Sequence, residues 1–469
     1  MAANQPLLIL HVIEQLTLGG PLNAIVGVVK YATPGSAQHR IVSLLPAQRR
    51  AREIALENGI AILSAPETET FTGLLASADI VQLHFWNSPE IHQFLAAPWP
   101  AMRVLVWCHV NGAAPPHILP RQLFEFGDVV VATAPSSLGL PVFRAADPER
   151  VALIPGGADF ARLAGLQAPA HPGFNVGYIG RLDFCKLHDA FVAMSAAINV
   201  PEIRFLVCGE GRDRAELARQ ARALGVSERF SLSGFVEDIA SILAQLDVFG
   251  YPLCAGNHAT GELTIQEAMY AGVPPVVFPF GGAAEIVANG RNGIIVQNAH
   301  EYSTAITSLY YNPAERKRLG ANAAQDARTR FGAQRSGPAL EAVFERMMAQ
   351  PKRIRASETN DPPACGTTGA WSLVRSLDSN GDADFVTSLT AAREEDAEAA
   401  EARLADASPN MADIVLQYRL RHPDDPHLRL WSGLVLKKRR NEIATAEFKA
   451  SLALGCDYPR VHRYFREGL

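Results

Sequence analysis

Two basic side chains follow an apolar stretch near the middle of the chain, in the segment Gly177-Tyr-Ile-Gly-Arg-Leu-Asp-Phe-Cys-Lys186. Arg181 and Lys186 are five residues apart, and the apolar run Phe174–Ile179 before them is typical of a strand. In open α/β sheets ligands bind at the carboxyl ends of strands, and two fixed cations there suit a diphosphate. The alternative interpretation is a pair of solvated loop cations.

A carboxylate stands in a second segment, which begins at His258 and reads HATGELTIQEAMYAGVP. Glu267 lies at the predicted start of a helix after the apolar run Val248–Tyr251, where it can face a cleft. A carboxylate accepts hydrogen bonds from both hydroxyls of a vicinal diol, the group that ribose presents. Thr264 and Glu267 also have the spacing of a capping box, so a purely structural role at the helix start stays open.

Two candidate residues lie in the first third of the chain. Gly20 follows Gly19 at a predicted turn from strand to helix, where glycines let backbone N–H groups approach an anion. Any tight turn of this kind also uses glycine. His109 follows the apolar run Val104–Trp107 and can hydrogen-bond a sugar hydroxyl or a developing charge, although an isolated histidine is commonly structural.

Nothing in the sequence indicates a metal site. The histidines show no ligand spacing such as HxxxH, and the one DxD pattern, Asp382-Ala-Asp384, lies far along the chain from the candidate residues. We therefore expect no metal and no other cofactor.

Short apolar runs alternate with segments of helical period, which predicts βαβ units around parallel sheets. The first series is Leu7–Val12, Ile41–Leu45, Ile60–Leu63, Ile80–Leu83, Val104–Trp107, Val129–Ala132 and Val151–Ile154. The second series, after a turn-rich stretch, is Phe174–Ile179, Ile203–Val207, Phe230–Leu232, Val248–Tyr251, Pro275–Phe278 and Gly293–Val296. An α/β fold is predicted, with two Rossmann-like domains at residues 1–170 and 171–349 that face a cleft.

The C-terminal part differs in composition. Residues 350–369 gather polar residues and proline and predict a linker, and residues 370–469 predict a small all-α module. Within it, the run from Asp425 to Leu434, then Ala444-Thr-Ala-Glu-Phe448 and Pro459, resembles a tetratricopeptide repeat. Because about one and a half units are too few for a free solenoid, the module must pack on the rest, on itself or on a protein partner. A helical cap and a docking surface both stay open.

The composition limits the class of protein. Apolar residues make up 48% and charged residues 19%, which is typical of a globular chain. A net charge of −5 without a long basic run argues against nucleic acid as a partner. The six cysteines are scattered and the N-terminus has no basic leader, so a cytoplasmic location with reduced thiols is expected. No apolar stretch approaches the ~20 residues of a spanning helix, so membrane contact is at most peripheral, at the inner membrane face.

Five segments together resemble the retaining glycosyltransferases of family 4, whose fold, GT-B, has two facing Rossmann-like domains. In chain order they are YIGRLDFCK, VCGEGRDRAEL, LSGFVEDI, LTIQEAMYAGVPPVV and GGAAEIVANGRNGIIV. The resemblance covers residues 7–348 and is strongest over 174–298. It implies a metal-independent enzyme that moves a sugar from a nucleoside-diphosphate sugar to an acceptor hydroxyl, with retention of configuration.

The resemblance also implies roles for individual residues. Arg181 and Lys186 match the diphosphate-binding pair of the family, and Glu267 matches its ribose-binding glutamate. The other matched positions surround the donor: Gly20 through its backbone, His109 facing the transferred sugar, Phe235 and Val236 bordering the base, and Leu263 and Thr264 offering backbone amides.

One position departs from the family pattern. The family has a first glutamate eight positions before the second, which in this chain is Ala259. Glu262 takes its place if the loop 258–261 brings that carboxylate toward the sugar; otherwise the sugar site is altered or inactive. We therefore carry two hypotheses. One is a glycosyltransferase of polysaccharide or glycoconjugate synthesis, acting on a glycan, lipid-linked or protein acceptor. The other is a nucleotide-sugar-binding scaffold that recruits protein partners through its helical tail.

Overall fold

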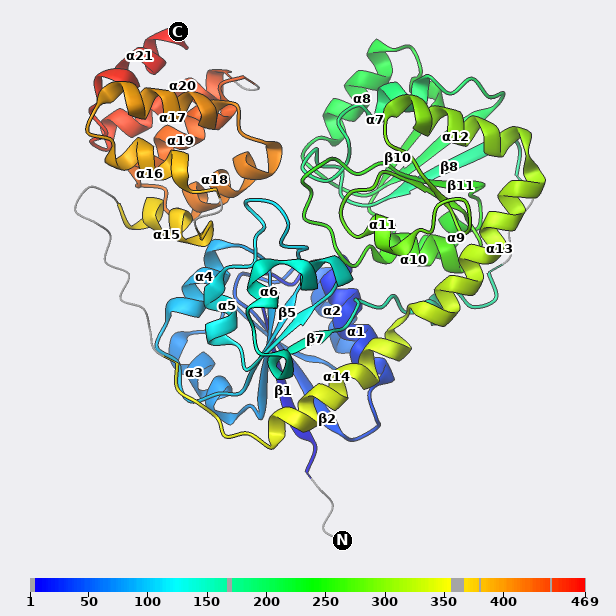
Figure 1. Ribbon diagram of the computed structural model, residues 1–469, viewed down its shortest axis with the longest axis horizontal. Helices are drawn as coiled ribbons and strands as arrows, with labels where there is room; N and C mark the ends of the chain where they lie inside the picture. Colours follow the sequence, from blue (N-terminus) through cyan, green and yellow to red (C-terminus); the bar gives the residue numbers. More distant parts are fainter. Residues whose placement is uncertain (1–4, 167–170, 356–366, 379–380, 439–440, 469) are drawn as a thin grey trace.

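The computed structural model describes residues 5–166, 171–355, 367–378, 381–438 and 441–468. Over these ranges the chain forms two α/β domains and a helical module, as Figure 1 shows. Within the same ranges no helix is long and apolar enough to cross a membrane. The five described cysteines are free, and Cys365 lies outside the described residues.

The first domain is built on a seven-stranded parallel sheet with the order β3-β2-β1-β4-β5-β6-β7. The strand order changes direction between β1 and β4. This is the topological switch point of the sheet, and α/β proteins bind ligands there, at the carboxyl ends of the strands. The strands are β1 (Leu7–Ile13), β2 (Ala37–Ser43), β3 (Ala61–Ser64), β4 (Ile80–Phe85), β5 (Val104–Cys108), β6 (Val129–Ala132) and β7 (Val151–Leu153).

The second domain repeats this plan with six parallel strands in the order β10-β9-β8-β11-β12-β13. Its switch point lies between β8 and β11. The strands are β8 (Phe174–Ile179), β9 (Ile203–Cys208), β10 (Phe230–Gly234), β11 (Val248–Tyr251), β12 (Pro275–Val277) and β13 (Ile294–Ile295). Every strand predicted from the sequence overlaps one of the observed strands, and the prediction of two Rossmann-like domains is confirmed.

Helices cover both sheets, as the alternating pattern predicts. In the first domain they are α1 (Gly20–Tyr31), α2 (Arg49–Glu57), α3 (Thr68–Ser77), α4 (Pro89–Ala96), α5 (Arg121–Phe126) and α6 (Pro141–Arg144). In the second they are α7 (Phe191–Ala196), α8 (Arg214–Ala223), α9 (Ile239–Leu243), α10 (Leu263–Tyr270), α11 (Ala283–Ile286), α12 (Ala299–Tyr311) and α13 (Pro313–Arg330).

One helix crosses from the second domain to the first. Helix α14 (Ala333–Met348) buries its apolar face, including Leu340 and Phe344, against Ile9 and Val28 of the first domain. Figure 1 shows α14 running alongside α1. The sequence prediction assigned residues 333–349 to the second domain, because helical period alone does not say which sheet a helix covers.

The start of the predicted linker is anchored to the first domain. Met102 and Arg353 form an antiparallel bridge, and the buried Arg355 pairs with Asp128 at 2.6 Å. Residues 356–366 of the predicted linker, and the predicted domain boundary at 170/171, include positions outside the described residues. Thus residues 350–355 extend the packing of the first domain.

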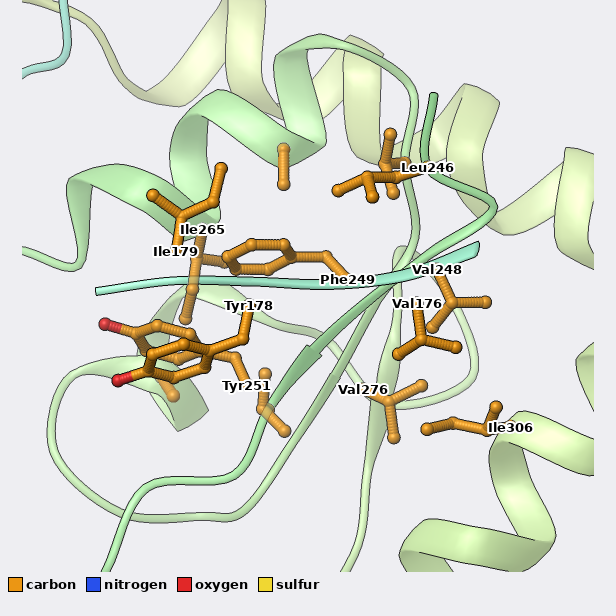
Figure 2. Close-up of a cluster of buried hydrophobic side chains, with 14 of the residues drawn as sticks. Val176, Tyr178, Ile179, Leu246, Val248, Phe249, Tyr251, Ile265, Val276 and Ile306 are labelled. Carbon is orange, nitrogen blue, oxygen red and sulfur yellow. The ribbon is translucent and has the colours of Figure 1, made fainter. Parts of the chain in front are cut away.

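Two tyrosines join the core of the second domain to the loops at its switch point. Tyr178 on β8 and Tyr251 on β11 stack with ring centroids 5.3 Å apart, and Figure 2 shows them side by side beneath Phe249. Both are buried. Their hydroxyls donate to the carbonyl of Arg181 and to the carboxylate of Glu262, each at 2.8 Å. The core therefore fixes two loops at the cleft.

The C-terminal module is helical, as predicted, and has its own buried core around Trp431. Gly433 allows α19 and α20 to pack closely, since a Cβ there would lie 2.5 Å from the ring of Phe448. The helices are α15 (Thr368–Ser376), α16 (Ala383–Thr390), α17 (Glu394–Ala405), α18 (Pro409–Arg421), α19 (Pro426–Leu436), α20 (Asn441–Ala453) and α21 (Pro459–Glu467).

The module packs on the rest of the chain and contacts both α/β domains. Asn87 of the first domain donates to the carbonyl of Ser376 at 3.0 Å. Asn410 on α18 donates to the carbonyl of Gly256 in the second domain at 3.0 Å. On the same helix Asp413 pairs with Arg212 at 2.5 Å. Arg421 of α18 donates to Gln93 of the first domain at 2.8 Å, so helix α18 bridges the two domains.

A buried ion pair gives a test of the module's packing. Arg460 is 4% exposed and donates to Glu401, which is fully buried, and to Glu394, both at 2.8 Å. Burial raises the pKa of Glu401. Arg460→Ala leaves this carboxylate without its charged partner, with Ser388 still donating to it, so we expect a loss of about 3–5 kcal/mol in the module's free energy of unfolding. Amide hydrogen exchange in α17 and α21 measures it.

The matched control is Arg463→Ala. Arg463 lies on the same helix as Arg460 and forms a half-exposed pair with Glu398 of α17. We expect this variant to lose less than about 1 kcal/mol. If Arg460→Ala and Arg463→Ala lose amide protection equally, the buried pair of Arg460 does not stabilise the module more than the half-exposed pair of Arg463.

Candidate functional site

A cavity of about 910 Å³ lies between the two α/β domains, at the carboxyl ends of both sheets. All ten residues singled out from the sequence line it, although they come from five separate segments. They are Gly20, His109, Arg181, Lys186, Phe235, Val236, Glu262, Leu263, Thr264 and Glu267. The structure thus brings the whole predicted set to one place.

Arg181 and Lys186, the two cations predicted to bind a diphosphate, are each held by neighbouring side chains. Arg181 Nε donates to Asp183 Oδ2 at 2.8 Å, and the fully buried Asp183 also accepts from the backbone N–H of Arg212 at 2.6 Å. Lys186 Nζ lies 5.5 Å from the ring centroid of Tyr251 and is mostly buried. Both cations line the cavity and each is paired with a carboxylate, with 59% of the Arg181 side chain and 19% of the Lys186 side chain exposed.

Glu262 is held at the start of α10 in an unusual backbone conformation. Its φ is 38° and ψ 53°, in the left-handed region that costs a residue with a side chain about 1–3 kcal/mol. Its Oε2 accepts from Tyr251 at 2.8 Å and lies 3.7 Å from Lys186 Nζ. The carboxylate therefore lies beside Lys186, which is predicted to bind the diphosphate, and it lines the same cavity as Ala259.

Glu267 projects from the first turns of α10 and is buried. It pairs with Arg162, from the segment that connects the two domains, and burial raises its pKa. Helix α10 begins at Leu263 with Glu262 as its N-cap, so Thr264 lies inside the helix. The capping-box alternative for Thr264 and Glu267 is therefore wrong, and Glu267 is a cavity residue.

His109 lines the opposite, first-domain side of the cavity. Its Nε2 is 2.8 Å from Nδ1 of His84, and its ring stacks on Trp86 with centroids 4.8 Å apart. Burial lowers the pKa of His109 to about 3, so the imidazole is neutral at pH 7. A neutral imidazole offers one donor or one acceptor to a ligand.

The remaining predicted residues form the edges of the cavity. Gly20 at the start of α1 faces the start of α10, since a Cβ on it would lie 3.9 Å from Leu263 Cδ1. The backbone N–H groups of Leu263 and Thr264 are in the first turn of α10, which carries partial positive charge. Phe235 is 46% exposed and Val236 half-buried on the loop after β10.

Sequence reasoning missed three contributors to the site. Arg162 pairs with Glu267, and Asn111 joins the domains by donating to the carbonyls of Asn257 and Ala259 at 2.9 and 3.1 Å. Asp413 of α18 also lines the cavity. The partners of these residues are distant in sequence, and no motif signals them.

A family model for glycosyl transferases group 1 matches residues 169–326, which form most of the second domain. A D-inositol 3-phosphate glycosyltransferase of Corynebacterium kroppenstedtii is 26% identical over 322 residues, which cover 60% of this chain and 69% of that protein. A GDP-mannose-dependent α-mannosyltransferase of Mycolicibacterium smegmatis is 34% identical over 149 residues, 31% of this chain and 36% of that protein.

Two solved structures share the fold. HepE of Anabaena, solved with UDP and glucose, superposes with a TM-score of 0.61 at 18% identity, covering 72% of this chain and all of that one. A sucrose-phosphate synthase of Thermosynechococcus elongatus gives 0.57 at 17% identity, covering 73% and 99%.

The two facing Rossmann-like domains have the GT-B architecture that these solved structures share. Residues 169–326 are similar to the glycosyl transferases group 1.

Glu14, at the carboxyl end of β1, gives a pH test of the cavity. Burial and the nearby Glu90 raise its pKa to about 7. Because an unfolded glutamate titrates near 4.3, Glu14 stabilises the fold at low pH, and this contribution is lost as pH rises through about 7. We expect the melting temperature of wild type to fall relative to Glu14→Gln between pH 5 and 8.

Thermal unfolding of both proteins at the two pH values measures the difference. Glu125→Gln, which alters an exposed carboxylate of the same domain, is the control. A difference between wild type and Glu14→Gln that is the same at both pH values would contradict the raised pKa.

Proposed function

We propose that the protein transfers a hexose from a nucleoside-diphosphate sugar to an acceptor hydroxyl, without a metal ion and with retention of configuration. The observation that carries the proposal is the convergence of Arg181, Lys186 and Glu267 on one cavity between the two domains. The acceptor then enters from the first-domain side, between the loops that begin at Trp86 and Asn111.

The arrangement of charge supports diphosphate as the leaving group. Arg181 is held by the buried Asp183, and Lys186 by Tyr251 and Glu262, so both cations are positioned before the ligand arrives. The first turn of α10 adds backbone N–H groups on the same side. Fixed positive charge at the place where negative charge develops lowers the barrier without reorganisation.

The nucleoside fits the other end of the cavity. A ribose diol would bind the Glu267 carboxylate, where Arg162 opposes the rise in pKa that burial causes, and the base would lie against the exposed ring of Phe235. HepE of Anabaena was solved with UDP and glucose, and the M. smegmatis relative is named for GDP-mannose. UDP and GDP sugars are therefore the first donors to test, followed by ADP sugars.

The role of the cations predicts a defect in turnover. Lys186→Ala removes a preorganised charge from the leaving group, so we expect kcat to fall about 10²–10³-fold, by analogy with the loss of one oxyanion donor. Arg181→Ala should show a similar loss. Release of nucleoside diphosphate in the presence of acceptor measures both.

Arg219→Ala is the matched control, because Arg219 is an exposed arginine on α8 that pairs with Glu216 of the same helix. It should turn over normally. Near-normal kcat in both Lys186→Ala and Arg181→Ala would refute the assignment of these two residues.

Metal independence has its own test. If the diphosphate is neutralised by protein groups alone, EDTA should leave the transfer rate unchanged, within about twofold. A strict requirement for added Mg²⁺ or Mn²⁺ would count against this part of the proposal.

A second candidate function is a nucleotide-sugar-binding scaffold whose helical module recruits a protein partner. Ala259 favours it, since its methyl group offers no hydrogen bond where the family has a glutamate, and Glu262 is already engaged by Tyr251 and Lys186. Incubation with UDP, GDP and ADP sugars and acceptor-containing extract separates the two. Donor binding, seen as a raised melting temperature, without nucleotide release would favour the scaffold.

A further inference from the structure

Four histidines form a hydrogen-bonded chain through the first domain. His39 Nδ1 lies 2.9 Å from His11 Nε2, His11 Nδ1 lies 3.0 Å from His84 Nε2, and His84 Nδ1 lies 2.8 Å from His109 Nε2. They come from β2, β1, β4 and the residue after β5, which are consecutive neighbours in the sheet. The chain therefore runs across the sheet from β2 to the cavity.

His39, His11 and His84 are buried, His109 is half-buried at the cavity, and all four are neutral at pH 7. His11 and His84 have no exposed surface, and His39 is 6% exposed. Burial lowers the pKa of each, to about 4 for His39 and about 3 for His109. Glu341 lies near the outer end, and its carboxylate accepts from Thr33 and Ser36.

Neutral imidazoles in such a chain cannot choose their tautomers independently. Each has one N–H donor and one acceptor nitrogen, so every link needs a donor on one ring and an acceptor on the next. With these atom pairs, all four rings carry the proton on Nδ1 or all four carry it on Nε2. Whether the free Nδ1 of His109 carries a proton is thus tied to the tautomer of His39.

Gln82 distinguishes the two states. Its amide Nε2, which can only donate, lies 3.4 Å from His84 Nε2, and its Oε1 is buried without a hydrogen-bond partner. With the amide in this orientation His84 Nε2 is an acceptor, so the proton of His84 is on Nδ1, and the same holds along the chain; the opposite orientation would place an acceptor there and reverse every link. In this state His109 accepts from His84 through Nε2 and has its own N–H on Nδ1, the nitrogen left for a ligand.

We propose that His39, His11 and His84 are positioning residues that hold His109 in the Nδ1–H tautomer, so that it presents a hydrogen-bond donor to an oxygen of the bound sugar. The identity of that ligand rests on the proposed function. The coupling of the four tautomers rests only on the hydrogen-bond geometry.

An isosteric pair of substitutions at His39 separates the two states. In His39→Asn the amide nitrogen takes the place of Nδ1–H and still donates to His11. In His39→Asp a carboxylate stands there, can only accept, and requires His11 to donate through Nε2, which reverses every link. Both substitutions are remote from the cavity, with two imidazoles between them and His109.

The tautomers are measured by ¹⁵N NMR of histidine-labelled protein without substrate. We expect Nδ1–H at all four histidines in wild type and in His39→Asn, and Nε2–H at His109 in His39→Asp. A wild-type chain of mixed tautomers, or an unchanged His109 in a folded His39→Asp, would overturn the proposal. If His39→Asp does not fold, the wild-type spectrum alone decides.

Kinetics test the consequence for transfer. We expect kcat of His39→Asp to fall about tenfold, the value of one hydrogen bond, with KM for the donor unchanged and with His39→Asn at the wild-type rate. Equal losses in both variants would mean that His39 is only structural. Absence of transfer by wild type would contradict the proposed function and leave the NMR result on the chain intact.

Discussion

The stacked pair of Tyr178 and Tyr251 is the interaction on which the site in the second domain depends. The two rings lie in the core on adjacent strands, and their hydroxyls reach the loops after β8 and before α10. Burying two aromatic rings contributes several kcal/mol to the domain, so the loops are fixed by the same packing that forms the fold. The cations and carboxylates of the cavity are positioned at no further entropic cost.

The fold could be predicted from the sequence because parallel strands buried on both faces leave a strong signal. Runs such as Val104–Cys108 are apolar throughout, and every predicted strand has an observed counterpart. The clearest shift is in β2, which begins at Ala37 instead of near Ile41, since Gln38, His39 and Arg40 pair with β1 through their backbone. Because these residues are polar, the pattern of apolar runs did not predict this part of β2.

The candidate site was predictable where a motif coincides with a strand end. Lys186 and Glu267 belong to segments with a recognisable pattern, and both reach the cavity. Arg162 and Asp413 could not be found in this way, since each acts on a residue far away in the sequence. The assignment of α14 to a domain failed for the same reason: its apolar face fits a sheet, and only the tertiary structure shows which one.

The connection of His109 to three other histidines can be seen only in the folded structure. As a single histidine after β5 it has no distinguishing pattern, and the other three histidines are 25 to 98 positions away from it along the chain until the strand order β2-β1-β4-β5 aligns them. Topology, rather than local sequence, makes the row of imidazoles.

The bridging position of α18 has a mechanical consequence. The α/β domains are joined covalently by the segment before β8 and by the step from α13 to α14. They are also joined non-covalently by α18, which contacts the second domain through Asn410 and Asp413 and the first domain through Arg421. Because the two domains are connected on both sides of the cavity, they cannot move apart freely, and any hinge motion must stretch the contacts of α18. Because the pair of Asp413 and Arg212 is partly solvated, dissolved ions weaken that fastening, and the amplitude of the motion depends on the electrolyte around the protein.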